Sequence, residues 1–220
     1  MASAFFADEI RRQRKAPTKA RVLLVEGSDD GYFFCQLLTD LGADPSNTEI
    51  VALGGKDNLA AEINQFLKSA AFVSQQIKRY AIVRDADDRP ANAVREIHGI
   101  LTAHGEPNPV HGTFLPATTP HQHEVGMYIL PSDLRSGDLD LVCLETVPVD
   151  PAIQCVSAYM NCIPRLPVGL TLPHKREVQV FLAGKEELCR GSGMGLQKGY
   201  FDKRHPSLDP IKAFLRAFIV

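Results

Sequence analysis

Three carboxylates follow a short apolar run near the middle of the sequence. Ala81–Val83 has the composition of a buried strand, and Asp85, Asp87 and Asp88 come soon after it. Residues two apart in an extended backbone project to the same side, so we expect Asp85 and Asp87 to lie side by side. Their repulsion would be relieved by a divalent cation that prefers hard oxygen ligands, such as Mg²⁺ or Mn²⁺. The alternative is a solvated acidic turn that caps the helix beginning near Pro90.

A carboxylate also ends the first predicted strand. Arg21–Val25 carries four consecutive apolar residues, which is typical of a strand buried on both faces of a parallel sheet. Glu26 follows directly, and a carboxylate in this position is partly desolvated and needs a partner. Ser28 is the expected N-cap of a helix whose first turn holds Asp29 and Asp30, where the helix dipole favours anions. Helix formation explains these two aspartates fully, but it explains Glu26 poorly.

The second predicted strand leads into a glycine turn. Ile50–Leu53 is apolar and is followed by Gly54, Gly55 and Lys56, before an amphipathic helix that reaches Leu67. Such a turn can present backbone N–H groups and an ammonium to a phosphate. The spacing differs from that of a P-loop, and an ordinary strand-to-helix turn is an equally good interpretation.

Strand and helix patterns alternate from residue 21 to residue 103. Because crossover connections are right-handed, this alternation predicts an α/β fold with a mostly parallel sheet and helices on both faces. The carboxyl ends of parallel strands then lie along one edge, where ligands bind in folds of this kind. We therefore expect Glu26, Lys56, Asp85 and Asp87 to meet at that edge.

The second half of the chain is mainly helical by its apolar pattern. Val110–Leu115 and Val125–Leu130 are further strand candidates, whereas helical periodicity dominates after Pro148 and ends in an apolar segment from Leu208 to Val220. The glycine-rich stretch Arg190–Tyr200 fits a mobile loop with a docked aromatic side chain. A stacking site for single-stranded nucleic acid is the alternative there.

The expected organisation has three parts. Residues 1–20 form a flexible basic leader, residues 21–147 form the α/β domain, and residues 148–220 form a mainly helical C-terminal extension packed on the same core. A hydrophobic content of 45% is enough for a sizeable core.

Composition and charge narrow the class of protein. The formal net charge of −2 does not favour a broad electrostatic grip on nucleic acid, although it allows a local basic groove. No apolar run has the length of a membrane span, and the first twenty residues have no signal-peptide core. The five cysteines include no Cys-x-x-Cys pair, which favours reduced thiols in a cytoplasmic protein.

The strand-end carboxylates resemble those of a known domain. Val25-Glu26-Gly27, followed some sixty residues later by Asp85-Ala86-Asp87, resembles the Toprim domain of topoisomerases, bacterial primases, recombination-repair proteins and overcoming-lysogenisation-defect nucleases. This resemblance implies a Toprim-like, Rossmann-like fold, with Glu26 as general acid/base or metal ligand. It also implies that Asp85 and Asp87 hold Mg²⁺, and the Gly54-Gly55 turn fits the turn after the second strand of that domain.

A second resemblance reaches further along the chain. Val25–Asp30, Gly54–Asp57 and Gly126–Pro131 are similar to stretches of small stand-alone prokaryotic Toprim-like proteins of unassigned function. The superfamily motif covers about the first hundred and thirty residues. Those proteins tend to have a Glu near the start of the next helix, where this chain has Asp140, and the shorter side chain puts a metal role there in doubt.

Three functions are compatible with these residues. The first is a Mg²⁺- or Mn²⁺-dependent phosphoryl-transfer enzyme acting on nucleic acid, such as a nuclease, with Glu26 moving the proton. The second is a binding module for a nucleotide or nucleic acid, and the third is a structural subunit of a defence or repair complex with a protein partner. Lys56 or Lys175 would bind the phosphate in the first two. The secondary carboxylates of the predicted site are Asp29, Asp30, Asp88 and Asp140.

Overall fold

A five-stranded sheet forms the centre of the computed structural model, which describes residues 5, 17–117, 122–162 and 173–220. The strands are β1 (Arg21–Val25), β2 (Thr48–Ala52), β3 (Arg79–Asp85), β4 (Thr113–Leu115) and β5 (Glu124–Leu130). Their spatial order is β2-β1-β3-β5-β4. The first four strands of this order run parallel, and β4 adds an antiparallel edge. The mostly parallel sheet expected from the sequence is confirmed.

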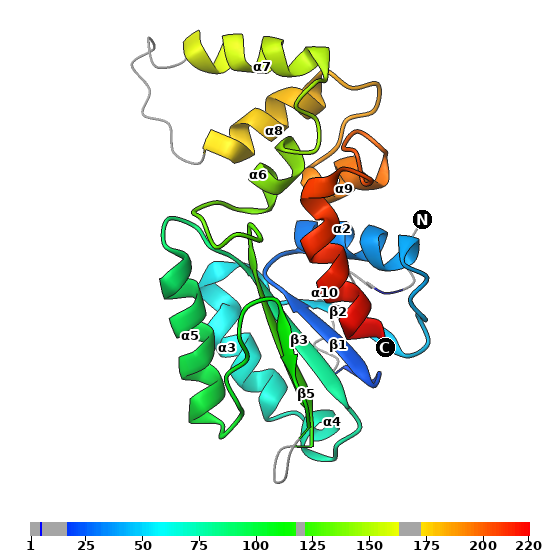
Figure 1. The fold of residues 1–220 in the computed structure, drawn as a ribbon, viewed down its shortest axis with the longest axis vertical. Helices are drawn as coiled ribbons and strands as arrows, with labels where there is room; N and C mark the ends of the chain where they lie inside the picture. The colour runs from blue at the N-terminus through cyan, green and yellow to red at the C-terminus, as the bar shows by residue number, and fades with distance from the viewer. Residues whose placement is uncertain (1–4, 6–16, 118–121, 163–172) are drawn as a thin grey trace.

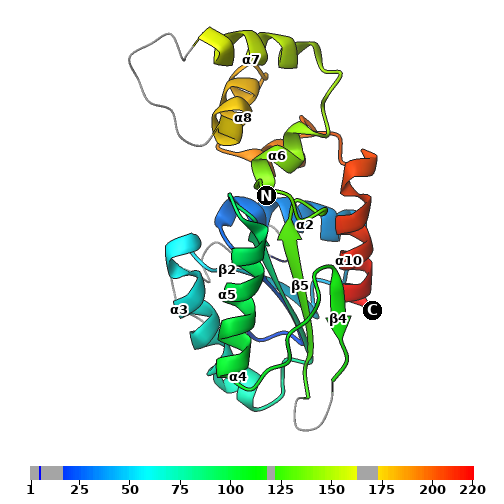
Figure 2. The ribbon, with the colours of Figure 1, turned by 60° about the vertical axis from the view of Figure 1, so that its left-hand side comes forward.

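Helices cover both faces of the sheet, with α3 and α5 on one face and α2 and α10 on the other (Figures 1 and 2). α6, α7 and α8 lie beyond the end of the sheet where the parallel strands finish (Figure 1). The helices are α2 (Ser28–Asp40), α3 (Lys56–Leu67), α4 (Ala70–Val73), α5 (Pro90–Ala103), α6 (Leu139–Leu144), α7 (Pro151–Cys162), α8 (Pro173–Ala183), α9 (Ser192–Gln197) and α10 (Asp209–Ile219), with a 3₁₀ turn η2 (Pro206–Leu208). In the part of the chain that the structure describes, no helix is long and apolar enough to cross a membrane.

Side chains alternate between two hydrophobic cores along the central strands. On β3, Tyr80 and Ile82 join the core beneath α3 and α5, whereas Ala81 and Val83 join the core beneath α2 and α10. All four side chains are fully buried. A strand covered on both faces needs apolar residues at consecutive positions, which explains why an unbroken apolar run predicted it.

The C-terminal extension contributes to the same core as the sheet. Phe181 of α8 and Phe218 of α10 belong to one buried cluster with Leu23 of β1. Phe214 of α10 stacks on Phe114 of β4, with 4.8 Å between the ring centroids. Aromatic contacts of this kind add to the stabilisation from buried area. The extension is therefore held against the sheet by core packing.

The glycine-rich stretch Arg190–Tyr200 contains helix α9, so the expectation of a loop there is wrong. α9 packs against α2, and a Cβ added at Gly193 would lie 2.0 Å from the carbonyl oxygen of Asp29. Glycine here permits the backbones of two helices to approach closely. Its role is close packing, which the sequence alone does not distinguish from chain flexibility.

Residues before β1 contact the outer edge of β2. β2 begins at Thr48, two residues earlier than expected, and the carboxylate of the buried Glu49 accepts a hydrogen bond of 3.0 Å from the Thr18 N–H. The Ile50 N–H donates to the Phe5 carbonyl at 3.0 Å, and the Phe5 side chain is buried. The rest of the expected flexible leader, residues 1–4 and 6–16, lies outside the described residues, so its flexibility stays a prediction.

We predict opposite effects for two glycine-to-alanine substitutions. Gly193→Ala should destabilise the fold by about 1–3 kcal/mol, because its Cβ would overlap the backbone of α2. Gly99→Ala should stabilise it by about 0.5–1 kcal/mol, because Gly99 lies in the exposed interior of α5 and its Cβ would meet no atom within 4 Å. Urea unfolding of both variants measures the difference. A Gly193→Ala protein as stable as the wild type would contradict the close packing of α9 on α2.

Candidate functional site

The register of the parallel strands brings the predicted residues to one edge of the sheet. Val25 at the end of β1 pairs with Ala52 of β2 and with Val83 of β3. Glu26 follows Val25 in the chain, and its carbonyl accepts a hydrogen bond of 2.8 Å from the Gly55 N–H. The turn after β2 is thereby attached to the end of β1, as the sequence predicts for strands whose carboxyl ends meet.

Glu26 carries a buried carboxylate oxygen without a partner. Among the described residues, no hydrogen bond reaches its Oε2 atom. Burial raises the pKa of Glu26, and the nearby Asp87 raises it further. Arg84 and a backbone hydrogen bond from Asp85 act in the opposite direction on this pKa. A carboxylate with a raised pKa is a stronger base than an ordinary carboxylate, which suits general acid–base chemistry.

Asp30 interacts more closely with the other carboxylates of the site than the sequence indicated. Its Oδ2 accepts a hydrogen bond of 3.0 Å from the Gly27 N–H, while its Oδ1 is buried with no partner among the described residues. The N-cap of α2 is therefore Gly27, and the expectation that Ser28 caps this helix is wrong. Burial, together with Glu26 and Asp29, raises the pKa of Asp30 to about 7. The helix-starting role predicted for Asp30 is thus combined with membership of an acidic cluster.

Asp85 lies at the end of β3 and points toward the start of α6. Its Oδ1 accepts a hydrogen bond of 3.0 Å from the Leu139 N–H, the first residue of α6. Burial and the carboxylates of Asp30 and Glu26 raise the pKa of Asp85 well above its usual value. Asp138 raises this pKa as well. Several other carboxylates of the cluster therefore lie near Asp85.

Asp87 does not continue the extended strand, so the simple side-by-side geometry expected for Asp85 and Asp87 is wrong. β3 ends at Asp85, and Asp87 has a left-handed backbone with φ of 52°. Two backbone hydrogen bonds with Gly137, of 2.9 and 2.8 Å, hold this turn. The Asp87 Oδ2 lies 2.6 Å from the Lys56 Nζ. The two aspartates still lie near each other, because Asp87 contributes to the raised pKa of Asp85.

These carboxylates form a cluster but not a ready-made metal shell. Among the described residues, no group of three or more His, Cys, Asp or Glu side chains is arranged to hold a metal ion. The donor set consists of hard carboxylate oxygens, and two of them, Glu26 Oε2 and Asp30 Oδ1, are buried with no partner in the described ranges. Such oxygens suit Mg²⁺ or Mn²⁺ in chemical type. Side-chain rotation at this edge is needed before three carboxylates share one cation.

The predicted phosphate-binding residues divide between two places. Gly54 and Gly55 have φ of 91° and 95°, a conformation that glycine adopts readily. Gly55 is the N-cap of α3, no side chain caps this helix start, and Lys56 is its first residue. Lys175 belongs to α8 in the extension. Burial raises the pKa of Asp29 and of Asp140, and the charge of Lys175 opposes this effect. The structure therefore brings Lys56 to the acidic cluster and places Lys175 near the docking site of α9.

The secondary carboxylates hold parts of the fold together. Asp29 accepts a hydrogen bond of 3.0 Å from the Gly193 N–H, and Asp140 accepts one from the Ser192 hydroxyl. Both contacts fasten α9, one from α2 and the other from α6. Asp88 is exposed, and its backbone carbonyl accepts a hydrogen bond of 2.8 Å from the Ser136 hydroxyl. These interactions give Asp29 and Asp140 a structural role.

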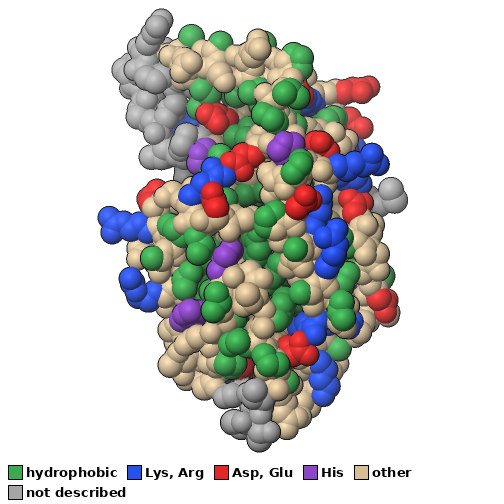
Figure 3. Space-filling view, in the orientation of Figure 1, with side chains coloured by type: hydrophobic (Ala, Val, Ile, Leu, Met, Phe, Trp, Pro, Cys, Tyr) green, Lys and Arg blue, Asp and Glu red, His purple; other side chains and the backbone are tan. Residues whose placement is uncertain are grey.

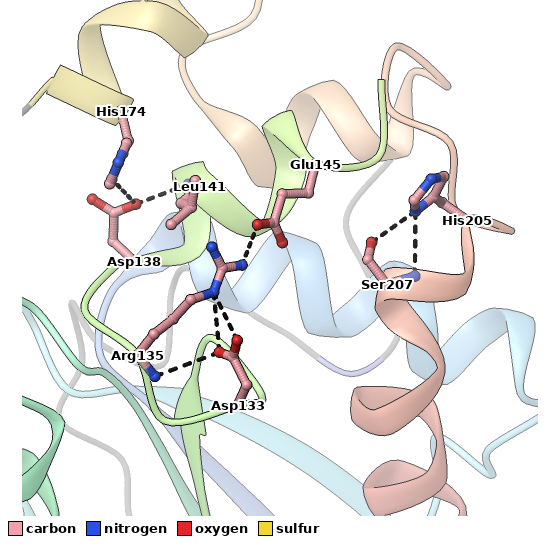
Figure 4. A network of polar contacts seen from close by, with 8 residues as sticks. All are labelled: Asp133, Arg135, Asp138, Leu141, Glu145, His174, His205 and Ser207. Atoms are coloured by element: carbon pink, nitrogen blue, oxygen red, sulfur yellow. Dashed lines mark hydrogen bonds and ion pairs between the residues drawn. The ribbon is translucent and has the colours of Figure 1, made fainter. Parts of the chain in front are cut away.

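Two polar residues near the site were not among the predicted site residues. Asp138 caps α6 through a hydrogen bond of 2.8 Å from the Leu141 N–H to its Oδ1. The same oxygen lies 3.2 Å from Nδ1 of His174, which reaches it from the first turn of α8 (Figure 4). No sequence signal links these two residues, because their proximity depends on how α8 docks beside α6.

Arg84 is a third residue that sequence reasoning missed. It is 4% exposed on the α5 side of the sheet and forms an ion pair with Glu96. Its charge lowers the pKa of Glu26, opposing the effect of burial. The sequence signal that could have identified Arg84 as a site residue is its position directly before Asp85. Buried arginines are rare without such a carboxylate partner.

Charged side chains of both signs share the visible surface. Figure 3 shows acidic and basic groups scattered over this face without a single large basic area. Beside the start of α6, Arg135 is engaged with Asp133 and Glu145 (Figure 4). This pattern agrees with the net charge of −2.

The chain belongs to the family described as "Protein of unknown function (DUF3226)", whose profile matches residues 20–220. No curated protein matches it significantly. A solved structure of the C-terminal region of the OLD protein of Xanthomonas campestris pv. campestris is similar to this chain, with 15% sequence identity and a TM-score of 0.35. The similarity covers 67% of this chain and 65% of that one, so the match spans less than two thirds of the length of the OLD structure.

The acidic cluster predicts a pH-dependent cost in stability. The folded-state pKa of Asp30 is about 7, whereas an unfolded aspartate titrates near pH ~3.9. The stability that this group contributes is therefore present below the unfolded pKa and is lost as the pH rises toward 7. Asp30→Asn keeps the acceptor for the Gly27 N–H and cannot ionise, so it should stabilise the fold at pH ~8 by roughly 1–3 kcal/mol.

The measurement is urea unfolding of wild type and Asp30→Asn between pH ~4 and ~8, where we expect the difference to grow with pH. Asp57→Asn is the matched control, because Asp57 is an exposed aspartate in the first turn of α3. If both substitutions changed the free energy of unfolding equally at every pH, the charge of Asp30 in the acidic cluster would not destabilise the fold.

Proposed function

We propose that this protein is a Mg²⁺- or Mn²⁺-dependent phosphoryl-transfer enzyme acting on nucleic acid, of the nuclease-type Toprim kind. The observation that carries the proposal is the gathering of Glu26, Asp30 and Asp85 at one edge of the sheet, where two buried carboxylate oxygens have no partner among the residues that the structure describes. Carboxylates held this close repel one another, and a divalent cation is the natural counter-charge. The spacing of Glu26, Asp85 and Asp87 supports the Toprim assignment.

The proposed roles follow from the chemistry of each side chain. Asp85 and Asp87 would hold the metal, with Glu26 close enough to act as a further ligand. A bound divalent cation neutralises phosphate charge and lowers the pKa of a coordinated water. Glu26 would take the proton from the nucleophile or return it to the leaving oxygen, and its raised pKa makes it a stronger base than an ordinary carboxylate.

The phosphate would bind where positive groups border the acidic cluster. Among the described residues, no side chain caps the start of α3, where the positive end of the helix dipole and the Lys56 ammonium would both attract a phosphate. A phosphate at the start of α3 would lie between the glycine turn and the carboxylates that hold the metal. Lys175, in the extension near Asp29 and Asp140, is the alternative lysine for the phosphate.

A binding module without catalysis is the second candidate. The net charge of −2 and the mixed surface in Figure 3 differ from those of a protein that grips long nucleic acid strongly. In this alternative, the same edge holds a metal ion with a nucleotide or a nucleic-acid end, and Glu26 moves no proton. A protein partner in a defence or repair complex is compatible with either candidate.

Substitution of the two aspartates should remove metal binding. Asp85→Asn together with Asp87→Asn takes both charged ligands away, so calorimetry should detect no Mg²⁺ or Mn²⁺ binding by this variant. Asp57→Asn is again the control and should bind as wild type does. Metal affinity that is unchanged in the double variant would place the cation elsewhere.

Glu26→Gln separates the enzyme from the binding module. The amide keeps the shape of the side chain but cannot transfer the proton, so the rate should fall by about 10²–10⁴-fold while most metal affinity remains. The assay uses labelled DNA, RNA and nucleotides with Mg²⁺ or Mn²⁺. If wild type turns over none of them but still binds nucleotide in a metal-dependent way, the binding module is the correct function.

A further inference from the structure

The acidic edge of the sheet already contains a positively charged group of the protein, the ammonium of Lys56. The Lys56 ammonium lies 2.6 Å from the Asp87 carboxylate. Asp87 raises the pKa of Lys56 through this hydrogen bond, and Glu26 contributes in the same direction. Lys56 therefore interacts with two of the carboxylates to which we assign the metal.

The position of Lys56 is fixed by its backbone more than by its side chain. Gly54 and Gly55 adopt positive φ, and the Gly55 N–H is bound to the Glu26 carbonyl. The helix begins at Lys56 directly after this turn. The flexible side chain can move while its Cα stays beside the cluster.

The contact between Lys56 and Asp87 is easily exchanged. The side chains are 56% and 36% exposed, and ion pairs between exposed groups contribute little net stability. Asp87 is held independently by its two backbone hydrogen bonds to Gly137. If the ammonium leaves, the backbone of Asp87 therefore stays in place beside the acidic cluster.

We propose that Lys56 and a divalent cation compete for Asp87, and that metal binding releases Lys56 to a phosphate group of the substrate. This inference rests on the proposed function and adds an order to it, with the metal first and the phosphate second. A single ammonium cannot neutralise Asp87 and a phosphate equally well at the same time. The metal therefore removes the intramolecular partner that otherwise lowers the affinity of Lys56 for phosphate.

The proposal has a thermodynamic consequence that can be measured from both sides. Coupling between two ligands is reciprocal, so phosphate should strengthen metal binding by the same factor by which metal strengthens phosphate binding. A part of this coupling passes through Lys56. Removing the ammonium should tighten metal binding and weaken the coupling together.

Lys56→Gln is the test variant, and Lys68→Gln is its control. Both remove one exposed lysine charge from the same helix, but Lys68 is at the opposite end, where it is the C-cap of α3. Calorimetric titration with Mn²⁺ should show affinity about two- to five-fold tighter for Lys56→Gln than for wild type, which corresponds to the loss of one exposed ion pair. Lys68→Gln should bind as wild type does.

A second measurement follows the ammonium itself. In NMR spectra of the lysine side chains, the signal assigned to Lys56 should shift when Mg²⁺ saturates the protein, and shift again when inorganic phosphate is added. The Lys68 signal should move in neither step. The increase in phosphate affinity caused by Mg²⁺ should be smaller in Lys56→Gln than in the two proteins that retain Lys56.

The outcomes separate this inference from the function on which it rests. Metal binding of equal strength in wild type and Lys56→Gln, with a stationary Lys56 signal, would overturn the exchange and leave the proposed metal site intact. No metal binding by wild type, Lys56→Gln or Lys68→Gln would overturn both. Binding by Lys56→Gln with none detected in wild type would support the competition directly.

Discussion

The repulsion among carboxylates at the carboxyl edge of the sheet is the constraint around which this molecule is built. Asp85 ends β3, Glu26 directly follows the adjacent parallel strand β1, and Asp30 joins them from the first turn of α2. Each has a raised pKa because burial and its neighbours disfavour the charged form. A fold that keeps such a group together loses stability at neutral pH unless a cation is nearby.

Several features of the fold reduce that cost. Backbone N–H groups at Gly27 and Leu139 donate to Asp30 and Asp85, so two of the carboxylates receive partial compensation from helix starts. Positive charge comes from Lys56, which contacts Asp87, and from Arg84, which opposes the raised pKa of Glu26. Within the described part of the chain, these contacts leave two carboxylate oxygens unpartnered, which is why we assign a divalent cation to this edge.

Sequence reasoning recovered the parts of the fold that depend on local pattern. The apolar runs that form β1 and β3, and the alternation of strands with helices, were sufficient to place Glu26, Lys56 and Asp85 at one edge. It failed where long-range contacts decide the local structure. Asp87 does not continue the extended strand, because its backbone is hydrogen-bonded to Gly137, fifty residues later in the chain.

Long-range contacts also explain why sequence reasoning missed or misjudged other residues around the site. His174 reaches Asp138 only because the extension packs into the core of the sheet, and no local pattern records that docking. The glycines near Gly193 indicated a loop, although they allow α9 to pack closely on α2. In each case, the deciding contact joins segments that are far apart in the sequence.

Anomalous diffraction from crystals grown with Mn²⁺ tests the central claim most directly. The account predicts an anomalous peak at the carboxyl edge of the sheet, bound by Asp85 and Asp87 with Glu26 beside it, and with the Lys56 ammonium displaced from Asp87. Anomalous signal at other carboxylates only, or none at this edge in crystals that contain Mn²⁺, would contradict the assignment of a metal to these side chains.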